Sequence, residues 1–411
     1  MTVLLSLSEA LADAEVFTDG DWVESKDQDP SGDVRLTQLA DVGDGNWIDK
    51  SARFLTSAKA KALRCTYLKP GDVLVARMPD PLGRCCIFPG NQMPCVTVVD
   101  VCVIRPNLAK IAPRYLMHAI NSPMGRRGIE RHITGTTRQR ISRKNLGKVQ
   151  IPLPPLAEQK RIAGILDAAD ALRAKRRDAI AQLDTLLQST FLDMFGDPVI
   201  NLMGWEEKLL AEVLQPDRPI AYGILKPGEY EEGGVMMLRI QDIRGGKVAA
   251  EGLHRVSQSL SAQYKRTLLS GGEIVVSLVG TIGLCALVPP HFAGANVHRN
   301  LAVLVPCDEL QPRFLLQYMV SDQFQRRIKE TTKGGNQGLL NLGDLKRLPI
   351  PIPPLDLQCR FSTIVESVEQ QKARMRTHLT ELDALFASLQ SRAFNGELSG
   401  TRSSELGTRS E

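Results

Sequence analysis

The 411-residue chain lacks the features of secreted, membrane-spanning and disulfide-rich proteins. No run of about 18 apolar residues offers a membrane span. No Lys or Arg precedes Lys26, and we therefore expect no signal peptide, which needs a basic start. The eight cysteines form no C-x-x-C pair, which argues against a zinc site and a disulfide framework. These absences favour a cytoplasmic protein that does not bind membranes.

Signatures of catalysis are also missing. The sequence has no G-x-x-x-x-G-K-[ST] phosphate loop, so we expect no ATP hydrolysis by this chain. Pro79-Asp80 and Pro216-Asp217 could begin a metal-dependent nuclease motif, but no acid-x-Lys element follows either pair within reach. The sequence also lacks the amine-methylation signature, which is an Asn or Asp followed by Pro-Pro-Tyr. The six histidines are too scattered for a metal site or a catalytic triad. We predict no catalytic residue, no metal site and no cofactor on this chain.

What the sequence does contain is a repeat. Ile151 to Leu156 reads IPLPPL, and Ile350 to Leu355 reads IPIPPL, 199 residues later. Pro113 to Leu116 matches Pro312 to Leu315 at the same offset, and the ordered series of matches makes chance recurrence a poor explanation. Because stacked solenoid repeats run at about 20 to 50 residues, a period this long indicates a domain duplication. With 43% apolar residues, each copy can bury a core.

Basic residues gather just before each proline box. The stretch from Arg126 to Lys148 holds eight Lys or Arg and one acid, and the stretch from Arg326 to Arg347 holds six and two. Each stretch includes a loop rich in Gly, Thr, Asn or Gln, and such loops can contact phosphates and base edges. A solvated helix face or an ordinary turn is the alternative for either patch alone. Duplication of the patch favours a shared binding surface.

A long helix is predicted after each box, because apolar residues recur there in steps of three and four. Gly196-Asp197-Pro198 and Gly396 indicate where the two helices stop. About 38 residues at roughly 1.5 Å each would span about 57 Å, which is more than one domain needs. The first stripe is Ile162, Ile165, Ala169, Leu172, Arg176, Ala179, Leu183 and Leu186, and the second is Ile364, Val368, Gln371, Met375, Leu379, Leu382, Leu385 and Leu389. We expect the two helices to pair antiparallel within the chain. Packing of each helix on its own domain, or between chains, is the alternative.

These features resemble the specificity subunits of Type I restriction-modification systems. The resemblance depends on the proline boxes with their helices, on the Met194-Phe195-Gly196-Asp197-Pro198 join, and on a Gly-Asp or Gly-Glu strand followed by Leu-Gly or Ile-Gly. It implies a non-catalytic subunit that reads a two-part target in double-stranded DNA. It also implies two methyltransferase subunits docked on the helices and two motor nuclease subunits. S-adenosylmethionine, ATP and Mg would then bind those partners.

The predicted fold class is α+β, with two similar mixed α/β target recognition domains, two long antiparallel helices forming an intramolecular coiled coil, and a pseudo-twofold internal repeat. The expected segments are recognition domain 1 at 1–155, helical region 1 at 156–197, recognition domain 2 at 198–354, helical region 2 at 355–396 and a disordered tail at 397–411.

Specific residues follow from these patterns. Helix pairing is assigned to apolar stripe positions: Ile162, Ile165, Leu172, Leu183, Leu186, Ile364, Val368, Met375, Leu382 and Leu385. DNA contact is assigned to polar and basic residues around the two loops: Thr136, Arg138, Arg140, Arg143 and Lys144 in the first half, and Lys333, Asn336, Gln337 and Lys346 in the second. Arg favours guanine, and Asn or Gln favours adenine, where a bidentate pair can form.

Two other classes of protein are weighed against DNA recognition. A protein-interaction scaffold could use paired domains and an oligomerising helical region, but it would not need the duplicated basic patch. A self-sufficient restriction enzyme would need further domains, and both halves of the chain are already used for recognition. Selection from a pool of random duplexes separates these possibilities, because only a two-part DNA reader returns a motif with a fixed gap.

Overall fold

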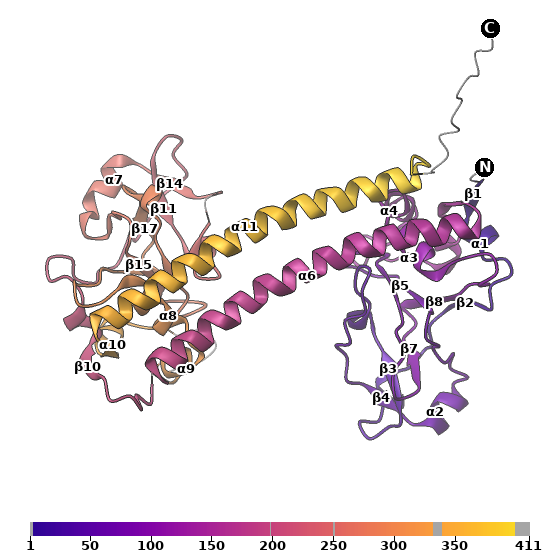
Figure 1. Ribbon diagram of the computed structural model, residues 1–411, viewed down its shortest axis with the longest axis horizontal. Helices are drawn as coiled ribbons and strands as arrows, with labels where there is room; N and C mark the ends of the chain where they lie inside the picture. The colour runs from indigo at the N-terminus through magenta and orange to yellow at the C-terminus, as the bar shows by residue number, and fades with distance from the viewer. Residues whose placement is uncertain (1–2, 198, 250, 332–338, 399–411) are drawn as a thin grey trace, which may run out of the picture. The chain divides into compact units, whose positions relative to one another are not determined.

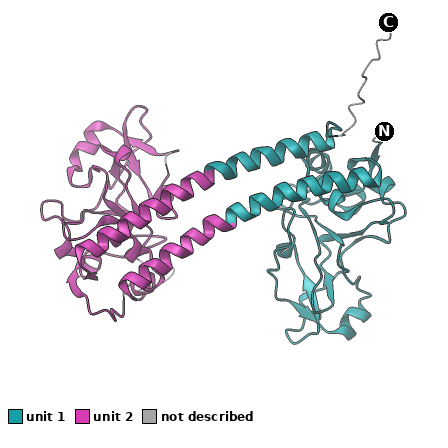
Figure 2. Cartoon of the chain, in the orientation of Figure 1, with its two compact units in different colours: residues 1–177, 377–411 teal, residues 178–376 magenta. Residues whose placement is uncertain are grey.

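The computed structural model describes residues 3–197, 199–249, 251–331 and 339–398 (Figure 1). The chain divides into two compact units, Met1–Arg177 with Thr377–Glu411 and Asp178–Arg376 (Figure 2). Two 40-residue helices, α6 (Leu156–Phe195) and α11 (Leu355–Phe394), each pass from one unit into the other. Each unit therefore combines a globular half with a segment of both helices, and the unit boundaries fall inside helices.

The globular half of the first unit is built on three small sheets, β1-β9, β2-β8-β5-β6 and β4-β3-β7. All neighbouring strands are antiparallel except β3 and β7, which are parallel. The strands are β1 (Val3–Ser6), β2 (Val16–Asp19), β3 (Val34–Thr37), β4 (Phe54–Leu55), β5 (Val73–Ala76), β6 (Cys85–Ile87), β7 (Cys95–Thr97), β8 (Val101–Arg105) and β9 (Gln150–Leu153).

Short helices complete this half: α1 (Leu7–Ala10), α2 (Ser57–Ala62), α3 (Pro113–Asn121), α4 (Pro123–Glu130) and α5 (Arg143–Leu146). Pro113 and Pro123 each occupy the first turn of a helix, where the missing N–H costs no hydrogen bond. The Ser122 hydroxyl caps α4 by accepting from the Gly125 N–H at 3.0 Å. One face of α3, including Leu116 and Ile120, is buried in the core that also takes in the start of α6.

The second unit repeats this plan with sheets β10-β19, β14-β11-β17, β12-β13 and β16-β15-β18, in which only β11 and β17 are parallel. Its strands are β10 (Glu206–Leu209), β11 (Val235–Leu238), β12 (Ile243–Arg244), β13 (Lys247–Val248), β14 (His254–Val256), β15 (Ile274–Ser277), β16 (Cys285–Leu287), β17 (Asn296–Val297), β18 (Leu301–Leu304) and β19 (Pro349–Ile352). Its short helices are α7 (Gln258–Gln263), α8 (Pro312–Val320), α9 (Asp322–Thr331) and α10 (Leu342–Lys346).

Each globular half is attached to the helix that follows it by one buried glutamine. The Gln159 side chain accepts from the Ala112 N–H at 2.9 Å and donates to the carbonyls of Lys110 and Pro154, both at 2.9 Å. Its counterpart in the repeat, Gln358, accepts from the Gln311 N–H at 2.8 Å and donates to the carbonyls of Glu309 and Pro353 at 3.0 and 2.8 Å. Both glutamines are buried. The duplication therefore includes the joint between domain and helix.

The two helices run antiparallel in each unit. In the first unit the start of α6, at Ile162, shares a core with Phe394 at the end of α11. In the second unit Phe191, near the end of α6, packs against Phe361 near the start of α11, with ring centroids 5.5 Å apart. The end of each helix also packs against the globular half that comes from the other copy of the repeat. At the end of α6, the ring centroids of Phe195 and Phe314 are 4.8 Å apart. The equivalent pair, Phe394 and Tyr115, lies at 5.6 Å. This arrangement confirms the predicted fold class.

The buried seam between the helices differs from the predicted stripe. Ile162 and Val368 are buried, and Ile165, Leu183, Ile364, Met375 and Leu382 are half-buried. Leu172, Leu186 and Leu385 are exposed, so their assignment to helix pairing is wrong.

The seam lies one residue further along on alternate turns. Leu187 is buried beside exposed Leu186, and Lys372 is buried beside exposed Gln371. Arg173 is half-buried where the prediction used Leu172. Steps of three and four both fit a helical stripe, and a search for apolar residues passes over a charged seam position. The seam between the helices therefore contains charged side chains.

Glycine ends both long helices in the predicted way. Gly196 and Gly396 follow the last helical turns with φ of 75° and 81°, a left-handed conformation that glycine adopts without strain. Leu398 packs against the first unit's core, so the ordered chain extends past Gly396, while residues 399–411 of the predicted disordered tail lie outside the described residues. Among the described helices, none is both long and apolar enough to cross a membrane.

Candidate nucleic-acid interface

The predicted contact loop of the first half is a closed, exposed turn. Thr134 and Arg140 exchange two backbone hydrogen bonds of 2.9 Å, which bring the two ends of the loop together. Gly135 has φ of 91°, and a Cβ there would lie 2.5 Å from the Arg138 carbonyl oxygen, so only glycine fits this turn. All residues from 134 to 140 are exposed. The fold therefore presents this loop to solvent on a fixed base.

The predicted contact residues around this loop fall into two groups. Thr136, Arg138 and Lys144 are exposed, and the Arg138 and Lys144 side chains form no hydrogen bond or ion pair with any described residue. Arg140 instead pairs with Asp100 at 2.8 Å, and Arg143 donates to the Phe17 carbonyl at 2.7 Å. The unpaired cations can meet a phosphate directly, whereas Arg140 and Arg143 must first give up a partner within the protein.

In the second half, the chain that follows the equivalent loop returns to the same place in the fold. In the first unit the Ile141 N–H donates to the Arg77 carbonyl just after β5, at 3.0 Å. In the second unit the Leu340 N–H donates to the Leu278 carbonyl just after β15, at 2.9 Å. Lys333, Asn336 and Gln337, predicted to touch DNA, lie outside the described residues. Lys346 is the last residue of α10 and is half-buried.

Arg77 supports the base of the first loop from below. Its side chain is buried and donates to the Val99 carbonyl at 2.5 Å, while a second guanidinium nitrogen lies 3.0 Å from an Asp19 oxygen. The turn that carries Val99 also carries Asp100, the partner of Arg140. One buried arginine therefore holds both the strand end where the loop returns and the turn to which the loop is tied.

A cleft that the sequence analysis did not anticipate lies beside this turn. Its volume is about 660 Å³, and its lining includes Trp22, Gln38, Arg53 and Asp100. The Trp22 side chain is 69% exposed, although aromatic side chains are usually at least half-buried. Exposed aromatic, amide and guanidinium groups are the types that stack on or hydrogen-bond to bases. The sequence offered no signal for the cleft, because its lining comes from several separate segments.

Asp21 lines the same cleft, and burial raises its pKa to about 6. The Thr66 N–H donates to its carboxylate at 3.0 Å, which partly opposes this effect. In the second unit the structurally equivalent residue is the fully buried Ile224. Both residues donate their backbone N–H at 2.8 Å to the parallel neighbouring segment, Asp21 to the Thr97 carbonyl and Ile224 to the Val297 carbonyl. The carboxylate is therefore particular to the first half.

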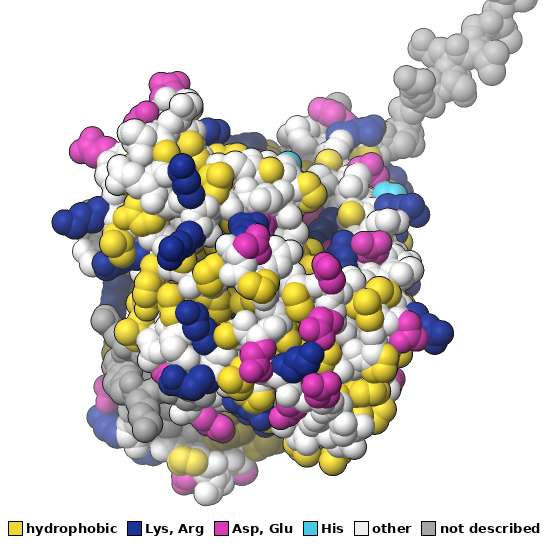
Figure 3. Space-filling model, turned by 90° about the vertical axis from the view of Figure 1, so that its left-hand side faces the viewer, with side chains coloured by type: hydrophobic (Ala, Val, Ile, Leu, Met, Phe, Trp, Pro, Cys, Tyr) yellow, Lys and Arg dark blue, Asp and Glu magenta, His cyan; other side chains and the backbone are white. Residues whose placement is uncertain are grey.

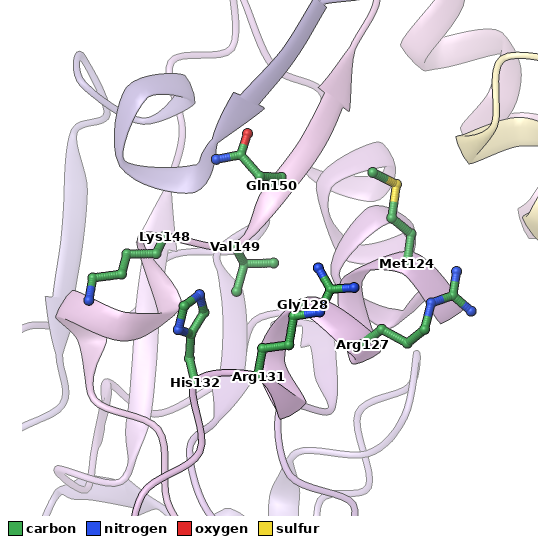
Figure 4. A pocket seen from close by; sticks show the side chains of 8 residues that line it. All are labelled: Met124, Arg127, Gly128, Arg131, His132, Lys148, Val149 and Gln150. Carbon is green, nitrogen blue, oxygen red and sulfur yellow. The ribbon is translucent and has the colours of Figure 1, made fainter.

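A second hollow, of about 240 Å³, lies at the end of α4 and is strongly basic. Arg127, Arg131, His132 and Lys148 contribute to its lining, and none of the four side chains forms an ion pair with a described residue. Figure 4 shows Arg127 and Lys148 pointing away from each other, with Arg131 and His132 between them. This spread suits an extended, negatively charged surface better than one small anion.

On the face drawn in Figure 3, basic and acidic side chains are interspersed, with apolar side chains between them. A mixed surface of this kind has polar groups that can select particular sequences as well as cations that attract phosphates. Within the described ranges, His, Cys, Asp and Glu form no group of three that could hold a metal ion.

Comparison with known proteins places these features in a family. The family model "Type I restriction modification DNA specificity domain" matches twice, at residues 20–182 and 204–384. The chain is 28% identical over 332 residues to the Type I restriction enzyme EcoBI specificity subunit of Escherichia coli, covering 72% of this chain and 68% of that protein. It is 20% identical to the putative MjaX specificity subunit of Methanocaldococcus jannaschii, covering 81% and 80%.

Solved structures share the fold. A chain from a type I R-M system, described in a study of complex assembly and conformational transition, superposes with a TM-score of 0.57 at 20% identity, covering 97% of this chain and 98% of that one. The S subunit of the Type I restriction-modification system from M. genitalium superposes with a TM-score of 0.54 at 16% identity, covering 96% of each chain. At these identities the likeness shows the fold alone.

Proposed function

Since this chain belongs to the Type I restriction modification DNA specificity family, we propose that each of its two globular halves reads one half of a two-part DNA target. The observation that carries this proposal is that the duplication preserves the scaffold and not the exposed surface. The joint made by Gln159 is repeated atom for atom by Gln358, whereas the exposed surfaces of the two halves differ. Two copies of one scaffold with different exposed side chains suit two different DNA sequences.

In this proposal the closed loop after Thr134 and the neighbouring cleft form the contact surface of the first half. Arg138 supplies a cation without a partner among the described residues, and Trp22 and Gln38 supply groups that can contact bases. The basic hollow near Arg131 adds charge for the phosphate backbone. The second half uses the loop that ends at Leu339 for the same purpose.

The helices have two roles in the proposal. Because α6 and α11 each join both units, their pairing sets the gap between the two half-sites. Their exposed leucines provide an apolar surface for methyltransferase subunits: Leu172, Leu186, Leu192, Leu355 and Leu385. This chain contributes no catalysis in the proposal. S-adenosylmethionine, ATP and Mg bind to the partners, which are two methyltransferase and two motor nuclease subunits.

Selection from random duplexes tests the proposal. The chain, co-expressed with a methyltransferase subunit so that the exposed leucines are covered, is incubated with a random DNA pool at two salt concentrations, and the retained DNA is sequenced. We expect two short motifs separated by a gap of constant length. A single contiguous motif, or retention without any motif, would contradict the proposal. Retention of polypeptides instead of DNA would favour a protein-interaction scaffold.

A further inference from the structure

The seam between the helices contains two charged groups of the same design. In the first unit, Arg173 on α6 pairs with Asp383 on α11 at 2.6 Å and with Asp170, one turn earlier on its own helix, at 2.8 Å. In the second unit, Lys372 on α11 pairs with Asp184 on α6 at 2.5 Å and with Glu369, one turn earlier on its own helix, at 2.6 Å. Each group is thus a seam cation held between an acid on its own helix and an acid on the other.

The two groups are copies of each other in the repeat. Lys372 follows Arg173 by 199 residues, Glu369 follows Asp170 by 199, and Asp383 follows Asp184 by 199. This is the offset of the proline boxes. Every member of the first group therefore has its counterpart in the second, with the roles of α6 and α11 exchanged.

Both groups specify one and the same alignment of the helices. Asp184 follows Arg173 along α6 by the same number of residues as Lys372 precedes Asp383 along α11. In an antiparallel pair, equal steps in opposite directions keep the alignment unchanged. The two units therefore carry the same register independently of each other.

The cations are enclosed to an extent that makes their partners matter. The Lys372 side chain is only 5% exposed and that of Arg173 18%. The Arg173 guanidinium also lies 4.3 Å above the Phe386 ring. Burial opposes the charge of Lys372, but the carboxylates of Asp184 and Glu369 outweigh it and raise the lysine's pKa. Removing the acid from an enclosed cation costs folding free energy, because a buried charge is left unpaired. Replacing such a pair by apolar residues can leave the stability unchanged.

Shifting one helix by one heptad shows what these groups exclude. A shift in one direction places Arg173 opposite Arg376 and Lys372 opposite Arg177, which sets cation against cation at both sites. A shift in the other direction places Lys372 opposite Phe191 and Arg173 opposite Gln390, which leaves both cations without an acid on the partner helix. The apolar positions of the seam tolerate such shifts far better, because a heptad step places apolar residues opposite apolar residues again.

We propose that the groups around Arg173 and Lys372 are register determinants, which select one axial alignment of α6 against α11. Apolar contacts stabilise the helix pair in several alignments, and the two cations make all but one of them unfavourable. This inference concerns the helix pair alone and stands without the proposed function. Where the proposed function also holds, the same residues keep the gap in the DNA target constant.

The test compares helix alignment in the wild type and in R173L/K372L. Spin labels are attached through p-acetylphenylalanine, which leaves the native cysteines untouched. They are placed at exposed positions within one unit: Leu186 with Gln370 in the second unit, and in a separate sample Leu172 with Leu385 in the first. We expect one distance in the wild type. In R173L/K372L we expect a second, longer distance, because a slip of one heptad displaces one helix along the other by about 10 Å.

K175L/R374L is the matched control, because these two exposed cations are also related by the repeat offset and form no ion pair with a described residue. It makes the same change of charge and apolarity outside the seam, and its distances should match the wild type. D184N/D383N provides a milder version, which keeps the cations but weakens their partners, and should give a smaller second population.

Retention of the single wild-type distance in both R173L/K372L and D184N/D383N overturns the inference. A second population of equal size in K175L/R374L also overturns it, since loss of any helix charge would then suffice. The distances are measured without DNA, so failure of the DNA proposal leaves this test intact. Conversely, a constant DNA gap with R173L/K372L already misaligned would remove the helices as the ruler without affecting the register assignment.

Discussion

The globular halves of the two units have equivalent joints to the helices but different exposed surfaces. Gln159 and Gln358 make the same three hydrogen bonds. At the end of α4, in contrast, Gly128 and Arg131 correspond at the repeat offset to Arg327 and Glu330, so two positions that line the basic hollow of the first half have different residues in the second. Positions that attach a half to its helix are repeated, and positions that face solvent are free to differ. The repeated positions therefore form the scaffold, and the differing positions are those that could determine specificity.

The largest expected effect comes from breaking the joint. Q159L leaves the Ala112 N–H and two carbonyls without their partner inside the protein, which should lower the free energy of unfolding by about 3 kcal/mol. Q358L should cost a similar amount, because its bonds are equivalent. Denaturant unfolding measures both, with exposed Gln188→Leu as the control. A cost below about 1 kcal/mol in either variant would show that the joints are not equivalent.

Charge reversal at the first contact loop should separate the halves functionally. R138E removes an exposed cation that has no partner in the part of the chain that the structure describes, so folding should be unaffected while DNA binding weakens about tenfold, or about 1.4 kcal/mol. In selection from random duplexes, the first half-site should lose its sequence preference and the second should keep it. K61E, on exposed α2, is the control. Equal loss at both half-sites would mean that the two halves do not read independently.

The stability of the first half should depend on pH through Asp21, whereas the second half has Ile224 at the equivalent position. Because burial raises the pKa of Asp21 to about 6 from 3.8, the folded state binds its proton more tightly than the unfolded state does. Stability from this group is therefore present below about pH 4 and is lost as pH rises to about 6. D21N should be more stable than the wild type by about 1 kcal/mol at pH 8, after allowance for partial exposure.

Thermal unfolding at pH 4 and pH 8 checks this sign. The advantage of D21N should shrink at the lower pH, where the wild-type carboxyl in the folded state is protonated and no longer places a charge in the partly buried site. An advantage that is independent of pH would show that the carboxylate is not what destabilises the cleft.

The smallest effect on stability is expected when the basic hollow is made to resemble the second half. R131E, which introduces the acid found at position 330, changes an exposed side chain and should alter the free energy of unfolding by less than about 0.5 kcal/mol. If the hollow faces phosphates, the slope of log affinity against log salt should fall by about 1 or more. An unchanged slope would remove the hollow from the DNA surface. Q92E, at an exposed polar position outside the hollow, is the control for added negative charge.

Much of this molecule was evident from local patterns along the chain. The proline boxes predicted where α6 and α11 begin, Gly196 and Gly396 predicted where they stop, and the constant offset between matching segments predicted two related halves. Each of these signals depends on neighbouring residues, because a proline excludes a helix before it and a glycine permits the left-handed turn that ends one.

By itself, then, the sequence determined the helices, the repeat and the family resemblance. Only the tertiary structure decided which side of each helix is buried, and it chose the side that contains Arg173 and Lys372 over the more apolar stripe through Leu172 and Gln371. It also assembled the cleft around Trp22 from segments far apart in the chain. The physical reason is the same in both cases. A charged or polar side chain can be buried only where another group pairs with it, and these pairing groups are distant in the sequence.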